Sequence, residues 1–310
     1  MALFRASESH GWRVGILPAE RETALAIVRS SRGQRPFLKH CAVHPAIEIR
    51  AEHVLAPLNH SRELARAAVS GVLSPEDYQL LQVEAPEVAP AELRGALRWR
   101  IKDLIDFPAS EAVIDVFDVP EQVRHLATRK VFAVAARDDA VRRVVGLVQP
   151  RAKGFDVIDI PELCLRNLAA LLPEDEQGVA LLALGEGFAQ LVLTCQGVLY
   201  LARRIELTWR AERSGEPTEP DAAALAVELQ RSLDYYESHY DREPIVTLVV
   251  ASGDGHAERL SSLLATETGL EARPLAVQEL LEIGAGIEPN VSWPGLVALG
   301  AALRAGGSTA

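Results

Sequence analysis

The chain has 310 residues, and at about 100–200 residues per domain this length predicts two domains. Its 43 acidic and 32 basic residues give a net charge of −11, which counts against a dedicated nucleic-acid binder, because such proteins neutralise phosphates with Lys and Arg. A hydrophobic content of 48% excludes wholesale disorder, and three scattered cysteines without a CxxC pair argue against a disulfide framework or a structural zinc site.

The first part of the chain opens with a meander. Short apolar runs separated by turn residues predict strands at 12–17, 23–29 and 36–43. Helical and strand periods then alternate along the chain. The predicted helices cover residues 61–69, 90–106, 138–147 and 161–172. The predicted strands cover residues 78–84, 112–119, 130–136 and 155–160.

The second part repeats this plan. An apolar stretch at 178–202 contains Glu186, Gln190 and Gln196 and several glycines, so it predicts packed strands and not a membrane helix. The strands predicted from it, divided at the glycine turns, are 179–184, 188–194 and 198–205. The elements predicted after this second meander are helices at 221–240, 256–267, 277–281 and 294–304 and a strand at 245–251.

The repeat of the meander indicates a duplicated fold. An acidic, proline-led segment at 173–177 predicts a first half over 1–174, with a small inserted subdomain around 84–125, and a second half over 175–310. We expect an α/β protein of two RNase H-like domains with a cleft between them. The architecture that fits is the actin-like one of Hsp70 and the sugar kinases, in which a nucleotide, when present, lies in that cleft.

Four dispersed segments carry a more specific signal. They are residues 97–120 (LRWRIKDLIDFPASEAVIDVFDVP), 156–182 (DVIDIPELCLRNLAALLPEDEQGVALL), 225–240 (LAVELQRSLDYYESHY) and 296–304 (LVALGAALR). In this order they resemble the PilM-type proteins of type IV pilus assembly, and most of all the MshI branch, which serves the mannose-sensitive haemagglutinin (MSHA) pilus.

The resemblance implies a cytosolic actin-fold protein that binds the cytoplasmic tail of a PilN-type inner-membrane protein. Such a protein is peripheral to the inner membrane through its partner, contacts a motor ATPase, and in many members binds ATP with slow or absent turnover. The N-terminus has no signal-peptide pattern, which agrees with a cytoplasmic location. A sister group, the GspL-type secretion proteins, continues into a membrane helix, whereas this sequence stops at Ala310 without one.

The glycine turns of an actin-type nucleotide site are retained in part. In such a site two aspartate-bearing turns hold the phosphates and Mg²⁺, and a third glycine turn approaches the adenosine. The glycines and the acidic residue at these turns are Gly15, Gly185, Glu186, Gly187, Gly253 and Gly255. The positions of the expected aspartates hold Leu17, Ala183 and Gln190, and Phe188-Ala189 replaces a threonine pair.

Two interpretations of these turns follow. Either Glu186 or Asp254 substitutes for a lost carboxylate and ATP with Mg²⁺ still binds weakly, or the glycines serve turn geometry and no cofactor binds. We favour the second, a degenerate nucleotide cleft without catalytic residues. A nucleotide-regulated ATPase of pilus or type II secretion assembly is the first alternative function, and a sugar or small-molecule kinase of the same superfamily is the second.

The helix expected at 90–106 supplies a candidate partner surface. It carries Trp99 and several basic residues among apolar positions, and in the resembling family this subdomain contributes to the groove for the PilN-type tail. We therefore take Leu97, Trp99, Ile101 and Lys102 as candidate partner contacts. The alternative is an amphipathic helix with a buried apolar face and a solvated basic face.

Three further clusters predict no chemistry. The carboxylates of Glu111, Asp115, Asp118, Asp156 and Asp159 are expected to lie on solvated strand edges or loops. The set His40, Cys41, His44 and His53 fits no compact zinc motif, so we expect no metal site. At the end of the helix at 221–240, Tyr236 and Tyr240 are four residues apart and are expected to pack together.

Overall fold

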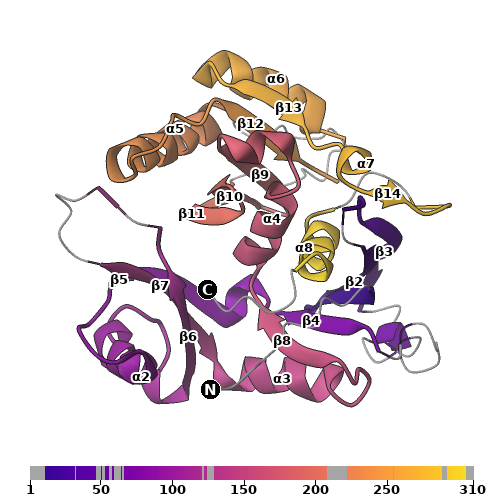
Figure 1. The fold of residues 1–310 in the computed structure, drawn as a ribbon, viewed down its shortest axis with the longest axis vertical. Helices are drawn as coiled ribbons and strands as arrows, with labels where there is room; N and C mark the ends of the chain where they lie inside the picture. The colour runs from indigo at the N-terminus through magenta and orange to yellow at the C-terminus, as the bar shows by residue number, and fades with distance from the viewer. Residues whose placement is uncertain are drawn as a thin grey trace, which may run out of the picture.

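The computed structural model describes residues 11–31, 33–46, 50, 53–55, 58, 64, 66–120, 122–123, 129–207, 222–253, 255–287 and 292–304. These residues form three sheets, with helices packed on and between them (Figure 1). None of the helices in this described part combines the length and the apolar character that a membrane span requires.

The first sheet has six strands in the order β14-β3-β2-β1-β4-β8. β1, β2 and β3 form the predicted antiparallel meander, while β4 and β8 add in parallel on one side and β14 pairs in parallel with β3 on the other. The strands are β1 (Gly11–Pro18), β2 (Glu22–Ser30), β3 (Phe37–Pro45), β4 (Ala68–Val72), β8 (Phe155–Asp159) and β14 (Glu282–Ile283).

The helix predicted at 61–69 is wrong at its end, because residues 68 and 69 already belong to β4. The four residues Val69–Val72 are all buried between neighbouring strands, and a short run buried on both faces has no alternation that identifies a strand. Most of the preceding residues of that predicted helix lie outside the described residues.

The small sheet is inserted between β4 and β8. It is antiparallel throughout, in the order β5-β7-β6, and one of its faces is covered by helix α2. α3 then leads back to the first sheet. The elements are β5 (Tyr78–Glu84), α2 (Pro90–Ile101), β6 (Ala112–Asp118), β7 (Lys130–Arg137) and α3 (Asp138–Val148).

The second sheet has the order β11-β10-β9-β12-β13, with the second predicted meander at β9–β11. β12 pairs in parallel with β9, as β4 does with β1, so the two halves share one plan. The strands are β9 (Val179–Gly185), β10 (Phe188–Cys195), β11 (Val198–Glu206), β12 (Thr247–Ala251) and β13 (Glu271–Pro274). The helices of this part are α5 (Ala222–His239), α6 (Ala257–Thr268) and α7 (Val277–Leu280).

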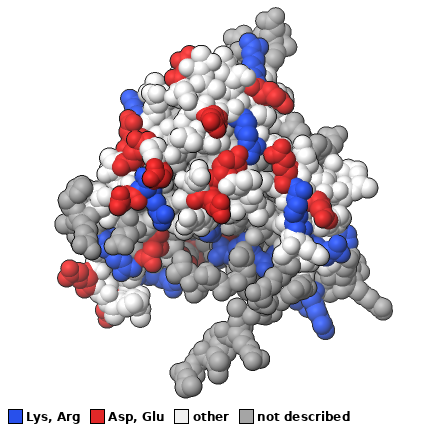
Figure 2. Space-filling model, turned by 45° about the horizontal axis from the view of Figure 1, so that its top comes forward, with Lys and Arg blue, Asp and Glu red and all other residues white. Residues whose placement is uncertain are grey.

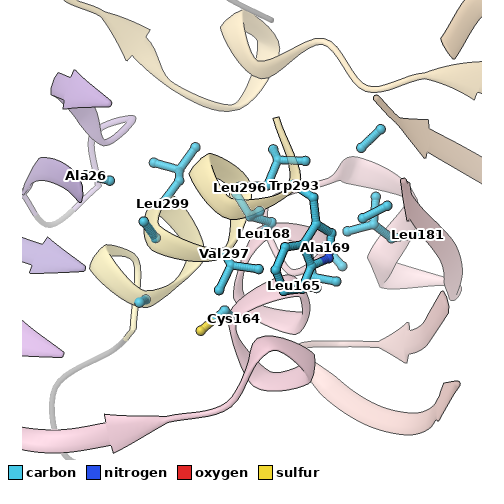
Figure 3. Packing of buried hydrophobic residues seen from close by; sticks show 14 of the residues in the cluster. Ala26, Cys164, Leu165, Leu168, Ala169, Leu181, Trp293, Leu296, Val297 and Leu299 are labelled. Atoms are coloured by element: carbon cyan, nitrogen blue, oxygen red, sulfur yellow. The ribbon is translucent and has the colours of Figure 1, made fainter. Parts of the chain in front are cut away.

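Two helices lie between the first and second sheets: α4 (Pro161–Ala169) and α8 (Trp293–Ala302) (Figures 1 and 3). All ten residues of α8 are buried, so this helix is apolar all round and has no solvent face. Gly300 allows the two helices to approach closely, because a Cβ there would lie 2.0 Å from the Cys164 carbonyl oxygen. α8 contacts β1 and β2, and β14 pairs with β3, so both of these late elements of the chain pack on the first sheet.

The tyrosines at the end of α5 pack as predicted. The rings of Tyr236 and Tyr240 lie 5.6 Å apart, and both pack edge-on against Tyr200 of β11 at 5.2 and 4.8 Å. The Tyr240 hydroxyl donates a hydrogen bond to the Tyr200 carbonyl oxygen. This aromatic cluster fixes α5 on the second sheet.

Candidate nucleotide cleft and partner surface

The first predicted nucleotide glycine, Gly15, lies under helix α8. A Cβ at this position would be 1.9 Å from the Ala298 carbonyl oxygen and 2.6 Å from the Ala302 amide nitrogen. Gly15 sits in the middle of β1, where the absence of a side chain lets the helix backbone approach the strand. Helix packing therefore accounts for this glycine, and α8 covers the side on which a Cβ would stand.

The second turn joins β9 to β10 through Glu186 and Gly187. Gly187 has φ of +77°, a left-handed conformation that glycine adopts without strain. Gly185 is covered by the ring of Phe188, which would come within 2.3 Å of a Cβ at that position. The Phe188 ring stands edge-on against Trp293 of α8 with centroids 5.0 Å apart, and the Arg204 guanidinium lies 3.7 Å from its centre.

The third turn follows β12 and also approaches the start of α8. A Cβ at Gly253 would lie 2.6 Å from the Cα of Ser292, the residue that precedes α8. Gly255 has φ of +81° and open space around it, so backbone conformation accounts for glycine there. Asp254, the other proposed substitute carboxylate, lies outside the described residues. Gly15 and Gly253 thus approach α8 or the residue before it directly, whereas Gly185 is separated from α8 by the ring of Phe188.

Two glutamates interact across the first two turns. Burial, and next the negative charge of Glu186, raise the pKa of Glu22 at the start of β2. The two glutamates therefore lie near each other, one on each turn, and each disfavours a further anion between them. The positions of the expected aspartates hold the buried Leu17 and Ala183. Within the described part of the chain, no three His, Cys, Asp or Glu side chains gather as a metal site would require.

A cavity of about 350 Å³ lies beside this region, between the small sheet and β11. At one end Glu162, in the first turn of α4, is buried and accepts hydrogen bonds from the Tyr78 hydroxyl and the Gln190 side chain. Burial raises the pKa of Glu162, and burial together with the Glu162 charge raises the pKa of Tyr78. In the sequence, Gln190 stands where an actin-type site would have an aspartate, and Glu162 is predicted in the first turn of a helix. No motif predicts that these two side chains are in contact.

The candidate partner residues on α2 separate into two groups. Leu97 and Ile101 are fully buried, so their side chains are unavailable to a partner. Ile101 packs in the core between α2 and the small sheet. Trp99 is 74% exposed and Lys102 is also exposed. Arg98 is not part of a solvated basic face, since its guanidinium donates to the Ala109 and Ala112 carbonyl oxygens.

The remaining clusters do not converge on a site. Asp115 and Asp118 on β6 form exposed ion pairs with Arg94 and Arg129, and the buried Asp159 at the end of β8 binds Arg304 at 2.7 Å. On β3, the His40 and His44 rings stack at 6.5 Å, and the Cys41 thiol points instead to the Gly295 carbonyl oxygen. Acidic and basic side chains intermix over the face shown in Figure 2.

The duplicated meanders, the two central helices and the facing glycine turns define an actin-like ATPase fold. Among solved structures, the chain is similar to a PilM–PilN type IV pilus biogenesis complex, with a TM-score of 0.68, 21% identity, and coverage of 94% of this chain and 98% of that one. It is also similar to the cytoplasmic domain of EpsL, an inner-membrane component of the Vibrio cholerae type II secretion system, with a TM-score of 0.51, 13% identity and 94% coverage of each chain. No family model and no curated protein sequence matches the chain.

Proposed function

We propose that this chain is an actin-fold assembly protein of a type IV pilus, which binds the cytoplasmic tail of a PilN-type inner-membrane protein. The observation that carries the proposal is the similarity to the PilM–PilN complex along 94% of this chain and 98% of that one. The four sequence segments that resemble the MshI branch favour an MSHA-type pilus within this class. In this function the protein lies on the cytoplasmic side of the inner membrane, where its partner holds it, and it also binds a motor ATPase.

The nucleotide cleft of this protein is degenerate in our proposal, so binding of the tail does not depend on ATP. Three observations support this. α8 covers the position of a Gly15 side chain, Phe188 covers Gly185, and Glu22 and Glu186 place two like charges at the turns that would hold phosphates. Mg²⁺ prefers carboxylate oxygens, and Leu17 and Ala183 stand where the fold would supply them.

The exposed side of α2 is our candidate contact for the tail. Trp99 offers a large, rigid apolar surface to a partner, and Lys102, three residues further on, is the C-cap of this helix. Such aromatic anchors contribute most of the binding energy at many interfaces. The exposed apolar side chains of Val88 and Leu104 lie before and after this helix in the chain.

A pull-down tests the proposed function. The immobilised cytoplasmic peptide of the PilN-type protein from the same organism is expected to retain the purified chain equally with and without Mg-ATP. Trp99→Ala is expected to weaken retention about tenfold or more, as hot-spot truncations do, while Val227→Ala on the exposed side of α5 leaves it unchanged. No retention of the wild-type chain would overturn the proposed function, and equal retention of Trp99→Ala would overturn the α2 contact.

The similarity to the EpsL cytoplasmic domain favours a second candidate, a cytoplasmic component of a type II secretion assembly. A second pull-down, with a cytoplasmic peptide of the type II secretion system as the bait, distinguishes this candidate from the pilus protein. Retention by the secretion peptide alone would support this second candidate.

A further inference from the structure

The cavity between the small sheet and the second sheet is bounded on one side by the edge of a strand. Five consecutive residues of β11, Tyr200–Arg204, line it. Side chains of a strand alternate between the two faces of its sheet, so a cavity above a face would touch every second residue. Contact with consecutive residues therefore means that the cavity runs along the strand's edge.

This edge of β11 has no partner strand among the described residues, since β11 ends its sheet. Beyond the pairing with β10, no hydrogen bond within the described part of the chain reaches the main chain of residues 201–205. A row of unpaired N–H and C=O groups on an outer strand is a template for another extended chain. The Tyr200 carbonyl oxygen, bound by Tyr240, marks one end of the free row.

The opposite wall is one face of the small sheet. Tyr78, Leu80 and Gln82 alternate along β5 and line the cavity together with Phe132, which pairs with Gln82 across to β7. A hydrogen bond of 2.8 Å from the Tyr235 hydroxyl to Gln82 closes the cavity at the Tyr200 end. An extended segment paired with β11 would thus lay one row of side chains against the apolar Leu80 and Phe132.

The other end of the cavity holds an unpartnered acceptor. Gln190 is only 2% exposed and lines the cavity, and its side-chain oxygen accepts no hydrogen bond. Gln190 donates its amide to Glu162, which leaves the oxygen free for a donor from a ligand. A buried acceptor without a partner is unfavourable, so a ligand that supplies an N–H or O–H group here is stabilised by the hydrogen bond it forms with Gln190.

The charges at the rim select an uncharged ligand. Arg203 is already paired with Glu228 at 3.3 Å, and Arg204 with Glu206 at 2.9 Å. Glu162 is served by Tyr78 and Gln190. A charged ligand group would lose its hydration in this enclosed space, and Arg203, Arg204 and Glu162 are already bound to other side chains and would not compensate for that loss.

We propose that this cavity binds an extended, uncharged polypeptide segment of a partner protein, which adds as a strand to the free edge of β11. Four steps of about 3.3 Å along Tyr200–Arg204 accommodate four to five residues, that is about 13 Å of extended chain. The segment places an apolar side chain on Leu80 and Phe132 and directs a hydroxyl or amide donor to Gln190. Trp99 and Lys102 do not line the cavity, so this site is separate from the α2 surface.

Selection from a phage-displayed library of seven-residue linear peptides on the full wild-type chain provides the probe. The enriched peptide is expected to slow hydrogen exchange of the main-chain amides in residues 201–205. Methylation of its backbone nitrogens is expected to weaken binding about tenfold at alternate positions and to have little effect at the intervening ones, because a paired strand directs every second N–H to its neighbour. This pattern requires no variant of the protein.

Two variants complete the test. Gln190→Leu keeps the size of the side chain but removes the acceptor, and it is expected to weaken the selected peptide about tenfold. Val198→Thr, at the exposed start of the same strand and outside the cavity, is expected to leave binding unchanged. The proposal is overturned if no peptide is enriched, or if the bound peptide leaves exchange of residues 201–205 unchanged. Because the peptides come from a library, failure of a PilN-type tail to bind would not alter either outcome.

Discussion

The two meanders share one topology but differ in what covers their outer strands. In the first sheet, β3 is the third strand of its meander and pairs with β14 near the end of the chain. In the second sheet, β11 holds the equivalent place and ends the sheet, with a cavity along its edge. β14 thus covers the start of β3 at Phe37 and Leu38, whereas β11 has no strand on its outer edge among the described residues, and such an edge is where a partner strand can add.

The turns of the two meanders differ in a second way that concerns the nucleotide. Both halves have kept glycine near the predicted phosphate turns, yet Gly15 makes room for α8 and Gly185 makes room for Phe188. Glycines that look like remnants of a ligand site can thus be maintained by packing alone. Substitutions in the two halves can distinguish a packing role from a ligand-binding role. The largest loss of stability is expected where an added side chain would collide with backbone atoms.

Gly15→Ala is expected to destabilise the protein most. The added Cβ would lie 1.9 Å from the Ala298 carbonyl oxygen, so α8 must move away from β1, at a cost of about 3 kcal/mol or more. Urea denaturation measures the change in the free energy of unfolding. The matched control is Gly95→Ala in α2, which has open space around it and is expected to stabilise the protein by about 0.5–1 kcal/mol. Equal stabilities for the two variants would contradict the proposed role of Gly15.

Phe188→Ala is expected to cost about 3 kcal/mol, because it removes a buried ring that packs on Gly185 and on the edge of Trp293. Leu263→Ala, at an exposed position of α6, serves as the control and is expected to change stability by less than about 1 kcal/mol. If Phe188→Ala proved as mild as this control, the ring would not be part of the packing that holds the second turn against α8.

Glu162→Gln tests the buried carboxyl at the end of the cavity. Burial raises the pKa of Glu162 above its ordinary value of 4.5, so the folded protein holds this proton to higher pH than the unfolded chain does. Its contribution to stability is full below 4.5 and is lost as the pH rises through the folded pKa. The variant cannot titrate, so its stability relative to wild type is expected to increase as pH rises from 4.5 to 8. Denaturation curves across this range measure the difference, and a parallel pH profile would count against a buried, titrating Glu162.

Glu186→Gln is expected to have the smallest effect. Removal of this charge lowers the pKa of Glu22 toward its ordinary value, although burial of Glu22 keeps part of the increase. A carboxyl titration of Glu22 by NMR in both proteins measures the change. An unchanged pKa would show that the two turns do not face each other.

Much of the fold follows from the sequence, since both meanders are runs of alternating or continuous apolar residues cut by glycine and proline turns. The strands that sequence reasoning missed are β4, β13 and β14, which are short and are each held in place by a parallel neighbour. For β4 and β14 this neighbour lies in the first meander, far away in the chain. Their pairing depends on tertiary contacts and not on local propensity.

The candidate site was predicted less well than the fold. The glycines were found, but the neighbour of Gly15, helix α8, is about 280 residues away in sequence, and no local pattern predicts that contact. Leu97 and Ile101, one turn apart on α2, are both buried, whereas Trp99 between them is exposed. Helical periodicity contains this distinction, but it does not say which face a partner would use.

Calorimetric titration of the purified chain with Mg-ATP tests most directly the claim that the glycine turns serve α8 and not a nucleotide. The expected result is no saturable heat up to millimolar ATP, with the same affinity for the PilN-type tail in its presence and absence. Saturable binding at low micromolar concentration, or a tail affinity that changes with Mg-ATP, would contradict it.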